Sequence, residues 1–225
     1  MNDPGEVWAI VPVKLTGGAK QRLAPVASAA LRQELALAML EDVLEAVAAV
    51  AGLGGMILVT VDAQAEALAR RYGAATIADG AYDGHTGAVV AGGRHLIARG
   101  RRTMLTIPGD LPLIAASEIE QLIGADGPAP AFTIAPAHDD LGSNAILMSP
   151  PDAVPLRFGE DSFVPHLAAA RAQGIEPCVV RVPGIAFDID NPQDLDHFAR
   201  LGSKTRAGTL ISLHAGEIGR KLEAR

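Results

Sequence analysis

The sequence predicts a single α/β domain with a mixed, mostly parallel central sheet and helices on both faces. Short apolar runs of strand length alternate along most of the chain with segments whose apolar residues recur every three or four positions. Most strand-like runs are separated by such a helical segment, which is the connection that parallel strands require. Polar or glycine-rich turns follow several of these runs, where sheets of this class bind their ligands.

Composition limits the number of domains and the classes of partner. The 225 residues are 49% hydrophobic, enough for one substantial core, which we expect over residues 7–201, with residues 202–225 as a C-terminal tail or helix. The formal net charge of −7 argues against a general binder of nucleic acids or membrane surfaces. A single cysteine excludes an intrachain disulfide. The first six residues carry no signal-like apolar segment, no run reaches membrane-spanning length, and we therefore expect a cytoplasmic protein.

The first half of the chain alternates strongly. The apolar run Val7–Val13 predicts the first strand, and Ser28–Val50 predicts a long helix because Leu31, Leu35 and Met39 share one face. The glycine-rich segment Gly52–Gly55 ends that helix. The remaining elements expected in this half are a strand at Met56–Val61, a helix at Gln64–Tyr72, a strand at Ala74–Ala78 and a helix at Thr86–Arg99.

The second half continues the pattern with one interruption. Two strand-like runs are joined by a short polar connection that resembles a hairpin, and the pattern weakens after Gly202. The expected elements are strands at Met104–Ile107, Ala131–Ala135, Ala145–Met148 and Cys178–Val182, and helices around Ser117–Ile123 and at Ser162–Gln173. An apolar patch at Leu210–Leu213 could pack on the domain or on a partner subunit, which leaves a homodimer possible.

The turn Pro108–Pro112 carries one carboxylate, Asp110, directly after a buried strand. Each bracketing proline fixes φ near −65° and removes a backbone donor, so the turn is rigid. A rigid carboxylate at the carboxyl end of a strand suits Mg²⁺, which takes oxygen ligands and bridges phosphates. The alternative is an Asp that caps the following helix near Ser117.

A second acidic motif occurs at Asp188-Ile189-Asp190-Asn191-Pro192. If residues 187–190 are extended, Asp188 and Asp190 point to the same side, where their charges repel unless a cation compensates. Asn191 followed by proline is by itself a good helix start, which is the alternative explanation. That alternative leaves Asp188 without a role, whereas a metal shared by Asp110, Asp188 and Asp190 explains all three acids.

The loop after the first strand combines adjacent glycines with cations. Adjacent glycines let backbone N–H groups approach phosphate oxygens, and cations neutralise them. The loop matches neither a Walker loop nor a GxGxxG fingerprint. Its candidate nucleotide-binding residues are Val13, Lys14, Gly17, Gly18, Lys20 and Arg22.

Lesser candidates lie at the same expected edge of the sheet. Asp62 follows the second strand, and Asp79, Gly80 and Gly84 follow the third. Ser143 opens a later strand after an acidic turn. Gly159 and Ser162 precede a helix and could offer its N-terminus and a hydroxyl to an anion, although an ordinary helix cap explains them equally well.

These motifs, in this order, resemble the 2-phospho-L-lactate guanylyltransferase family, whose bacterial members are also described as phosphoenolpyruvate or 3-phospho-D-glycerate guanylyltransferases. The resemblance runs from about Val7 to Leu201, and its more specific part is Gly142-Ser143-Asn144 together with Phe158-Gly-Glu-Asp-Ser-Phe163. It implies the glycosyltransferase-A type, nucleotide-diphospho-sugar transferase-like fold. It also implies GTP as co-substrate, Mg²⁺ as cofactor, a phosphorylated three-carbon acid as acceptor, and a role in making the deazaflavin coenzyme F420.

The family's functional residues carry over to matching positions. The resemblance implies that Asp110 and Asp188 hold the metal, that Lys14, Lys20 and Arg22 serve the triphosphate, with Lys20 acting in catalysis, and that Ser143, Gly159 and Ser162 bind the acceptor. The chain departs from the family at Ser143, where threonine is more usual. It departs again at Gly84-His85-Thr86, where a Gly-Leu-Asn type sequence is common. We expect this second loop and Asp79 to border the base, with the Asp79 carboxylate accepting from the N–H groups of guanine.

Other activities are compatible with the same motifs. A glycosyltransferase of this fold, or a sugar or molybdenum-cofactor nucleotidyltransferase, would also place acids at this edge. A nucleotide-sensing domain without chemistry is the non-enzymatic alternative, and such a protein would be expected to have lost some of the three acids.

Overall fold

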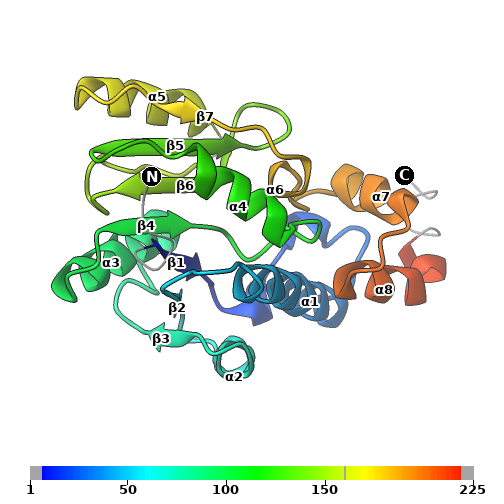
Figure 1. The fold of residues 1–225 in the computed structure, drawn as a ribbon. Helices are drawn as coiled ribbons and strands as arrows, with labels where there is room; N and C mark the ends of the chain where they lie inside the picture. The colour runs from blue at the N-terminus through cyan, green and yellow to red at the C-terminus, as the bar shows by residue number, and fades with distance from the viewer. Residues whose placement is uncertain (1–6, 160, 219–225) are drawn as a thin grey trace.

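The structure, a computed structural model, describes residues 7–159 and 161–218 and contains one seven-stranded mixed sheet (Figure 1). The strands in spatial order are β3-β2-β1-β4-β6-β5-β7. Only β6 runs against its neighbours; β1–β2, β2–β3, β1–β4 and β5–β7 are parallel pairs. The strands are β1 (Val7–Pro12), β2 (Gly55–Val59), β3 (Ala75–Ile77), β4 (Thr103–Thr106), β5 (Ala131–Pro136), β6 (Ser143–Ser149) and β7 (Cys178–Val179).

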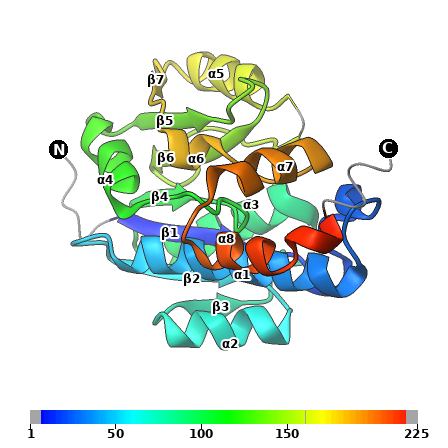
Figure 2. The ribbon, with the colours of Figure 1, turned by 90° about the vertical axis from the view of Figure 1, so that its right-hand side faces the viewer.

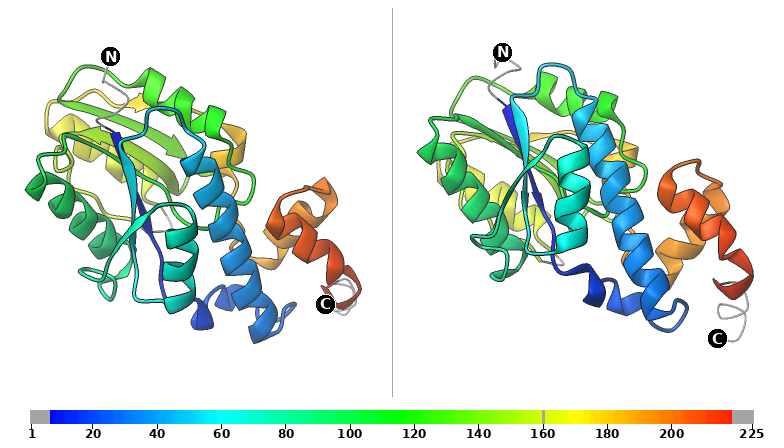
Figure 3. Two further views of the ribbon diagram at one scale, coloured as in Figure 1. Left: turned by 60° about the horizontal axis from the view of Figure 1, so that its bottom comes forward. Right: turned by 90° about the horizontal axis from the view of Figure 1, so that it is seen from below.

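Helices cover both faces of the sheet, so the predicted fold class is confirmed (Figures 1 and 3). One face packs against α1 (Ala29–Ala48), α2 (Ala63–Arg71) and α4 (Ala116–Ala125). The other face packs against α3 (Gly84–Ala98) and α5 (Phe163–Ala172). Apolar side chains alternate between the two cores: in β1, Ala9 and Val11 join the first core and Ile10 joins the second.

The C-terminal helices form a third apolar cluster against α1. They are α7 (Pro192–Leu201) and α8 (Arg206–Leu213), which lie together beside α1 (Figure 2), at the right-hand end of the molecule in Figure 1. The buried Ile211 of α8 lies in one cluster with Leu35 of α1, so this part of the predicted apolar patch packs on the domain itself, whereas Leu213 is 78% exposed. Residues 219–225 of the expected tail lie outside the described residues.

Strand order explains why loops far apart in the sequence meet. The chain leaves β1 towards β2 and β3 on one side and returns to β4 on the other, so the order reverses between β1 and β4. Ile10 pairs with Thr106, and the loops that follow β1 and β4 therefore emerge side by side. Because β6 is antiparallel to β4, with Ile146 opposite Thr106, its beginning at Ser143 reaches the same edge.

The expected extended segments near the C-terminus are shorter than predicted. β7 has two residues and is followed by a short helix, α6 (Pro183–Ala186), that the sequence analysis did not predict. Residues 187–190 belong to no strand of the sheet, although the backbone of Phe187 is extended. Their side chains still alternate, because Ile189 is fully buried while Asp188 and Asp190 line a cavity. Within the described part of the chain, no helix is long and apolar enough to cross a membrane.

Candidate active site

Two adjoining cavities lie at the carboxyl edge between β1, β4 and β6. The first, of about 390 Å³, is lined mainly by the loop after β1 and by the Pro108–Asp110 turn. The second, of about 780 Å³, is lined by the start of α3, the start of β6, the segment before α5 and the second acidic motif. The two cavities share Lys14, Arg22, His85, Pro108, Asp110 and Asp190 as lining residues.

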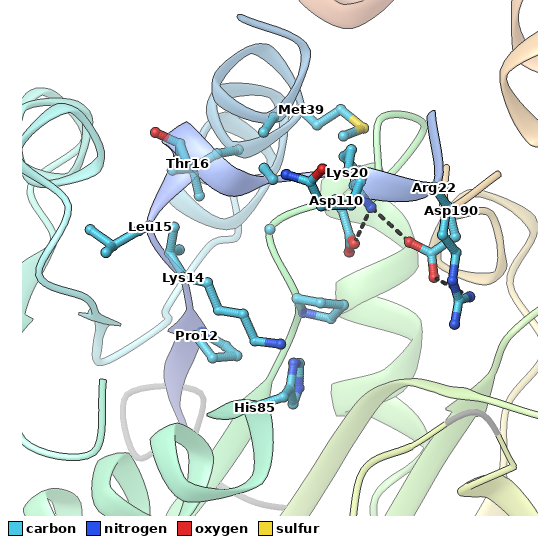
Figure 4. Close-up of a pocket in the computed structure, with 17 residues that line it drawn as sticks. Pro12, Lys14, Leu15, Thr16, Lys20, Arg22, Met39, His85, Asp110 and Asp190 are labelled. Carbon is cyan, nitrogen blue, oxygen red and sulfur yellow. Dashed lines mark hydrogen bonds and ion pairs between the residues drawn. The ribbon is translucent and has the colours of Figure 1, made fainter. Parts of the chain in front are cut away.

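Lys20 joins two of the predicted acids (Figure 4). Its Nζ atom lies 2.6 Å from Oδ2 of Asp110 and 2.9 Å from Oδ1 of Asp190. The residue adopts left-handed backbone dihedrals, with φ 51°, between two short 3₁₀ turns, and this aims the side chain inward from an exposed loop. Arg22 approaches the other oxygen of Asp190 at 4.0 Å. Two of the predicted cations, Lys20 and Arg22, therefore pair with two of the predicted acids, Asp110 and Asp190.

Asp110 sits on its turn as a cavity-lining carboxylate and does not cap a helix. The N-cap position of α4 is Ala115, so the capping alternative does not hold. Burial alone would raise the pKa of Asp110, but the ammonium group of Lys20 holds it below its usual value. Asp110 is therefore an anion at neutral pH.

The negative charge of Asp188 is less well compensated by neighbouring groups than that of Asp110. Burial raises the pKa of Asp188 to about 6, and the charges of Asp110 and Asp190 act in the same direction. Its described hydrogen-bond donor is the Asn144 side chain, whose Nδ2 lies 3.3 Å from Oδ1 and also donates to the Ile185 carbonyl at 2.9 Å. Asp110, Asp188 and Asp190 thus line one cavity, and the ammonium group of Lys20 forms ion pairs with Asp110 and Asp190.

The donor set fits a magnesium ion in its chemistry. Mg²⁺ prefers oxygen ligands, usually one or two carboxylates with water and substrate phosphates. Asp110 and Asp188 supply such oxygens, and a cation there would offset the repulsion that raises the pKa of Asp188. In residues 7–159 and 161–218, no three His, Cys, Asp or Glu side chains form a preassembled metal cluster.

Asp62 holds the loop after β1 in place through hydrogen bonds with Thr16. Its Oδ2 accepts hydrogen bonds from both the backbone and the hydroxyl of Thr16, each at 2.7 Å. Its Oδ1 caps α2 by accepting from Gln64 N and Ala65 N. Hydrogen bonds from Thr16 hold the pKa of Asp62 below its usual value although burial opposes this. Asp62 lines neither cavity, and the structure gives it a positioning role under the loop.

The predicted acceptor residues meet at the second cavity. Ser143 at the start of β6 and Ser162 at the start of α5 place their Oγ atoms 3.2 Å apart. Gly159 lines the same cavity, and a Cβ atom at this position would meet nothing within 4 Å. Ser162 occupies the N-cap position of α5, yet its side chain makes no capping hydrogen bond, which leaves the hydroxyl for other partners.

Of the other residues predicted to bind the nucleotide, some line a cavity and others do not. Val13, Lys14 and Gly84 line the cavities. Gly17 and Gly18 are exposed within a short 3₁₀ turn and line neither cavity. Gly80 has φ 76°, and a Cβ atom there would lie 2.8 Å from the carbonyl oxygen of Gly87, so its glycine is required by packing. Asp79 is exposed in the turn after β3, outside both cavities.

His85, in the loop expected to border the base, lies at the start of α3 and lines both cavities, and burial lowers its pKa to about 4. Its ring lies 4.4 Å from that of Phe158. Two further residues, Asn144 and His166, belong to the site although the sequence analysis did not assign them to it. Asn144 holds Asp188, and His166 contacts Ser143. The sequence holds a signal for each: Asn144 belongs to the Gly142-Ser143-Asn144 motif, and His166 lies one helical turn beyond Ser162.

Comparisons with known proteins agree with the predicted family. A family model described as guanylyl transferase CofC like matches residues 7–213. The chain is 38% identical over 189 residues to the phosphoenolpyruvate guanylyltransferase of Rubrobacter xylanophilus, covering 84% of this chain and 91% of that protein. It is 32% identical over 194 residues to the 3-phospho-D-glycerate guanylyltransferase of Colwellia psychrerythraea, covering 86% and 91%.

A solved structure shows the same fold. A protein from Desulfovibrio desulfuricans G20 assigned to the nucleotide-diphospho-sugar transferases superposes with a TM-score of 0.76 at 18% identity, covering 96% of this chain and 98% of that one. The family match and the sequence identities to the relatives above show the family, whereas the solved structure shows the fold alone. This chain is a nucleotidyltransferase, and it belongs to the CofC-like guanylyl transferase family.

Proposed function

We propose that this enzyme transfers GMP from GTP to the phosphate group of a phosphorylated three-carbon acid and releases pyrophosphate. The observation that carries the proposal is the convergence of Asp110, Asp188 and Lys20 beside the Ser143–Ser162 hydroxyl pair. Negative and positive groups for a triphosphate and its metal thus adjoin polar donors for a second anion. We place the reaction in the synthesis of the deazaflavin coenzyme F420, on the family resemblance.

Among acceptors, we favour phosphoenolpyruvate. The relative named for it is 38% identical to this chain, against 32% for the relative named for 3-phospho-D-glycerate. Both acids carry a phosphate and a carboxylate, so both need donors on the protein. 2-Phospho-L-lactate has the same two anionic groups and belongs in the same test.

The reaction needs charge control rather than a general base. An oxygen of the acceptor phosphate attacks the α-phosphorus of GTP, and the bond from that phosphorus to the bridging oxygen of pyrophosphate breaks. The nucleophile is already an anion, so the main obstacle is the repulsion between two anionic substrates. Lys14, Lys20 and Arg22 line the first cavity, where they would neutralise the triphosphate and hold it in line.

Asp110 and Asp188 are the residues that would hold Mg²⁺, with Asp190 beside them. The ion, when bound, supplies positive charge that screens the phosphates and orients them. Ser143, Ser162 and the backbone near Gly159 would hold the acceptor in the second cavity. The reversal of strand order between β1 and β4 would bring both substrates to one edge of the sheet.

A panel of four nucleoside triphosphates crossed with the three acceptors, read by pyrophosphate release, tests the proposal. We expect release with GTP and phosphoenolpyruvate in the presence of Mg²⁺, and none after EDTA treatment. Product mass must increase by one GMP unit on the acceptor. Transfer of a sugar from a nucleotide sugar, with no pyrophosphate from any combination, would instead assign the enzyme to the glycosyltransferases of this fold.

A further inference from the structure

A chain of three buried polar side chains runs from α5 to the second cavity. His166 of α5 is 1% exposed, and its Nδ1 lies 2.9 Å from Oγ of Ser143. Oγ of Ser143 lies in turn 3.2 Å from Oγ of Ser162. Both serines are more than nine-tenths buried and line the second cavity, whereas His166 stands behind them and does not line it.

The other ring nitrogen of His166 fixes which way this chain is polarised. Nε2 lies 3.0 Å from the backbone N of Arg157, which is always a donor, so Nε2 is an acceptor and carries no proton. Burial lowers the pKa of His166 to about 4, and the ring is therefore neutral at pH 7. A neutral ring without a proton on Nε2 carries it on Nδ1. Nδ1–H then donates to Oγ of Ser143.

Counting protons shows what this tautomer does for the cavity. The two hydroxyls hold two protons, and one of them is used in the hydrogen bond between Ser143 and Ser162. Because His166 donates to Ser143, the second hydroxyl proton remains for a ligand. In the opposite tautomer, Nδ1 would accept a hydrogen bond from Ser143. The hydroxyl proton of Ser162 would then be used in the bond to Ser143, and neither hydroxyl would donate to the cavity. The tautomer therefore decides whether the pair donates to the cavity.

A donor is what an anionic acceptor requires. Carboxylates and fully ionised phosphates only accept hydrogen bonds. The Ser162 side chain makes no capping hydrogen bond to α5. The backbone N–H of Phe163 donates to the Leu141 carbonyl at 2.8 Å. The residue two positions further, Pro165, has no N–H to offer. The hydroxyl pair is therefore an important source of donors at this end of α5.

We infer that His166 is a positioning residue that holds the Ser143–Ser162 pair in its donating direction towards an anionic group of the acceptor. The inference rests on the proposed function for the identity of the acceptor. The histidine touches no substrate and acts through Ser143. Its second hydrogen bond, to Arg157, anchors the segment before α5, so the two ring nitrogens have separable roles.

The tautomer can be read directly in the unmodified enzyme by long-range ¹H–¹⁵N NMR of the histidine rings, with the His166 signal assigned by its loss in a His166 variant. We expect a proton on Nδ1 and none on Nε2 at pH 7. A proton on Nε2 would overturn the inference. This measurement requires neither turnover nor a variant that retains activity.

Two conservative substitutions separate the two ring nitrogens. His166→Asn keeps a donor near the position of Nδ1, whereas His166→Gln keeps an acceptor near the position of Nε2. We expect the KM for phosphoenolpyruvate to rise about ten- to a hundredfold in His166→Gln, as for the loss of a hydrogen bond to a charged group, and to stay within about threefold in His166→Asn. The KM for GTP should change in neither variant.

His95→Asn, on α3 and outside both cavities, is the matched control for the substitution itself. If His166→Gln binds phosphoenolpyruvate normally and His166→Asn does not, the histidine acts only through the Arg157 segment and the inference is wrong. Equal losses in both variants, or equal effects on both substrates, overturn it too. An Nδ1–H ring in an enzyme that uses none of the three acceptors would count against the proposed function and not against the tautomer.

Discussion

The ammonium group of Lys20 bridges Asp110 and Asp190, at 2.6 and 2.9 Å, across 90 and 170 residues of sequence. Its side chain is only 10% exposed although its backbone belongs to a surface loop. A buried ammonium group costs solvation energy unless it is paired, and two carboxylates supply that pairing here. The contact ties the loop after β1 to the turn after β4 and to the segment before α7.

Replacing Asp110 tests the central acid. Asp110→Asn removes a charge at a cavity-lining turn and leaves the apolar cores intact, so we expect a folded protein whose turnover falls at least about a hundredfold. Pyrophosphate release and circular dichroism measure the two properties. Asp152→Asn, an exposed acid in the turn after β6, is the matched control. Activity above about a tenth of wild type would exclude an essential electrostatic role.

Lys20→Met tests whether the lysine shares its position with the metal. Without the ammonium group, Asp110 and Asp190 lose their shared cation, so we expect tighter Mn²⁺ binding in the absence of GTP, measured by electron paramagnetic resonance. Turnover should still fall about a hundredfold, since a cation for the triphosphate is lost. Weaker Mn²⁺ binding would show that the lysine supports the metal site instead. Lys204→Met, on the loop before α8, controls for loss of a lysine elsewhere.

Acid should destabilise the fold through His166. Its pKa is about 4 in the folded chain and near 6.5 when unfolded, so only the unfolded chain gains this proton between those values. The stabilisation is complete above pH 6.5 and is lost as the pH falls towards 4, by at most about 3 kcal/mol. Urea unfolding at pH 7, 5.5 and 4.5 measures it. His166→Gln should show a shallower dependence, and identical slopes would disprove the assignment.

The choice of base is tested at Asp79. A carboxylate can accept from N1–H and N2–H₂ of guanine, an edge that adenine does not present, and losing such a partner is strongly unfavourable. Asp79 is exposed after β3, at the same edge of the sheet as the other loops. We expect GTP to exceed ATP by well over tenfold in kcat/KM, and Asp79→Ala to narrow that ratio. An unchanged ratio would assign base selection to other residues.

The sequence predicted those features that depend on only a few neighbouring residues. Asn191 accepts from the backbone N of Gln193 and Asp194 and starts α7, as its Asn-Pro sequence indicates. The rigid turn that presents Asp110 follows from its two prolines. Ser28 caps α1, as the start of the long apolar repeat predicts.

Other features depend on tertiary contacts that no local pattern encodes. Asp62 looks like any polar residue after a strand, and its role follows from Thr16, 46 residues earlier. The contact of His166 with Ser143 exists only because β6 is antiparallel and brings its first residue to the start of α5. Short segments such as α6 contain too few residues for a periodic pattern to be recognised.

Because β6 runs antiparallel to its neighbours, two different stretches of the chain supply the two parts of the candidate site. The loops around Lys20 and Asp110 follow parallel strands, whereas Ser143 and Ser162 are delivered by the β5–β6 hairpin and the helix after it. These two sets of residues are contributed by separate stretches of sequence, 7–110 and 131–172. We expect exchange of the stretch 131–172 for that of a relative with another acceptor to change acceptor preference, although residues of the first stretch such as Lys14 and His85 also line the second cavity.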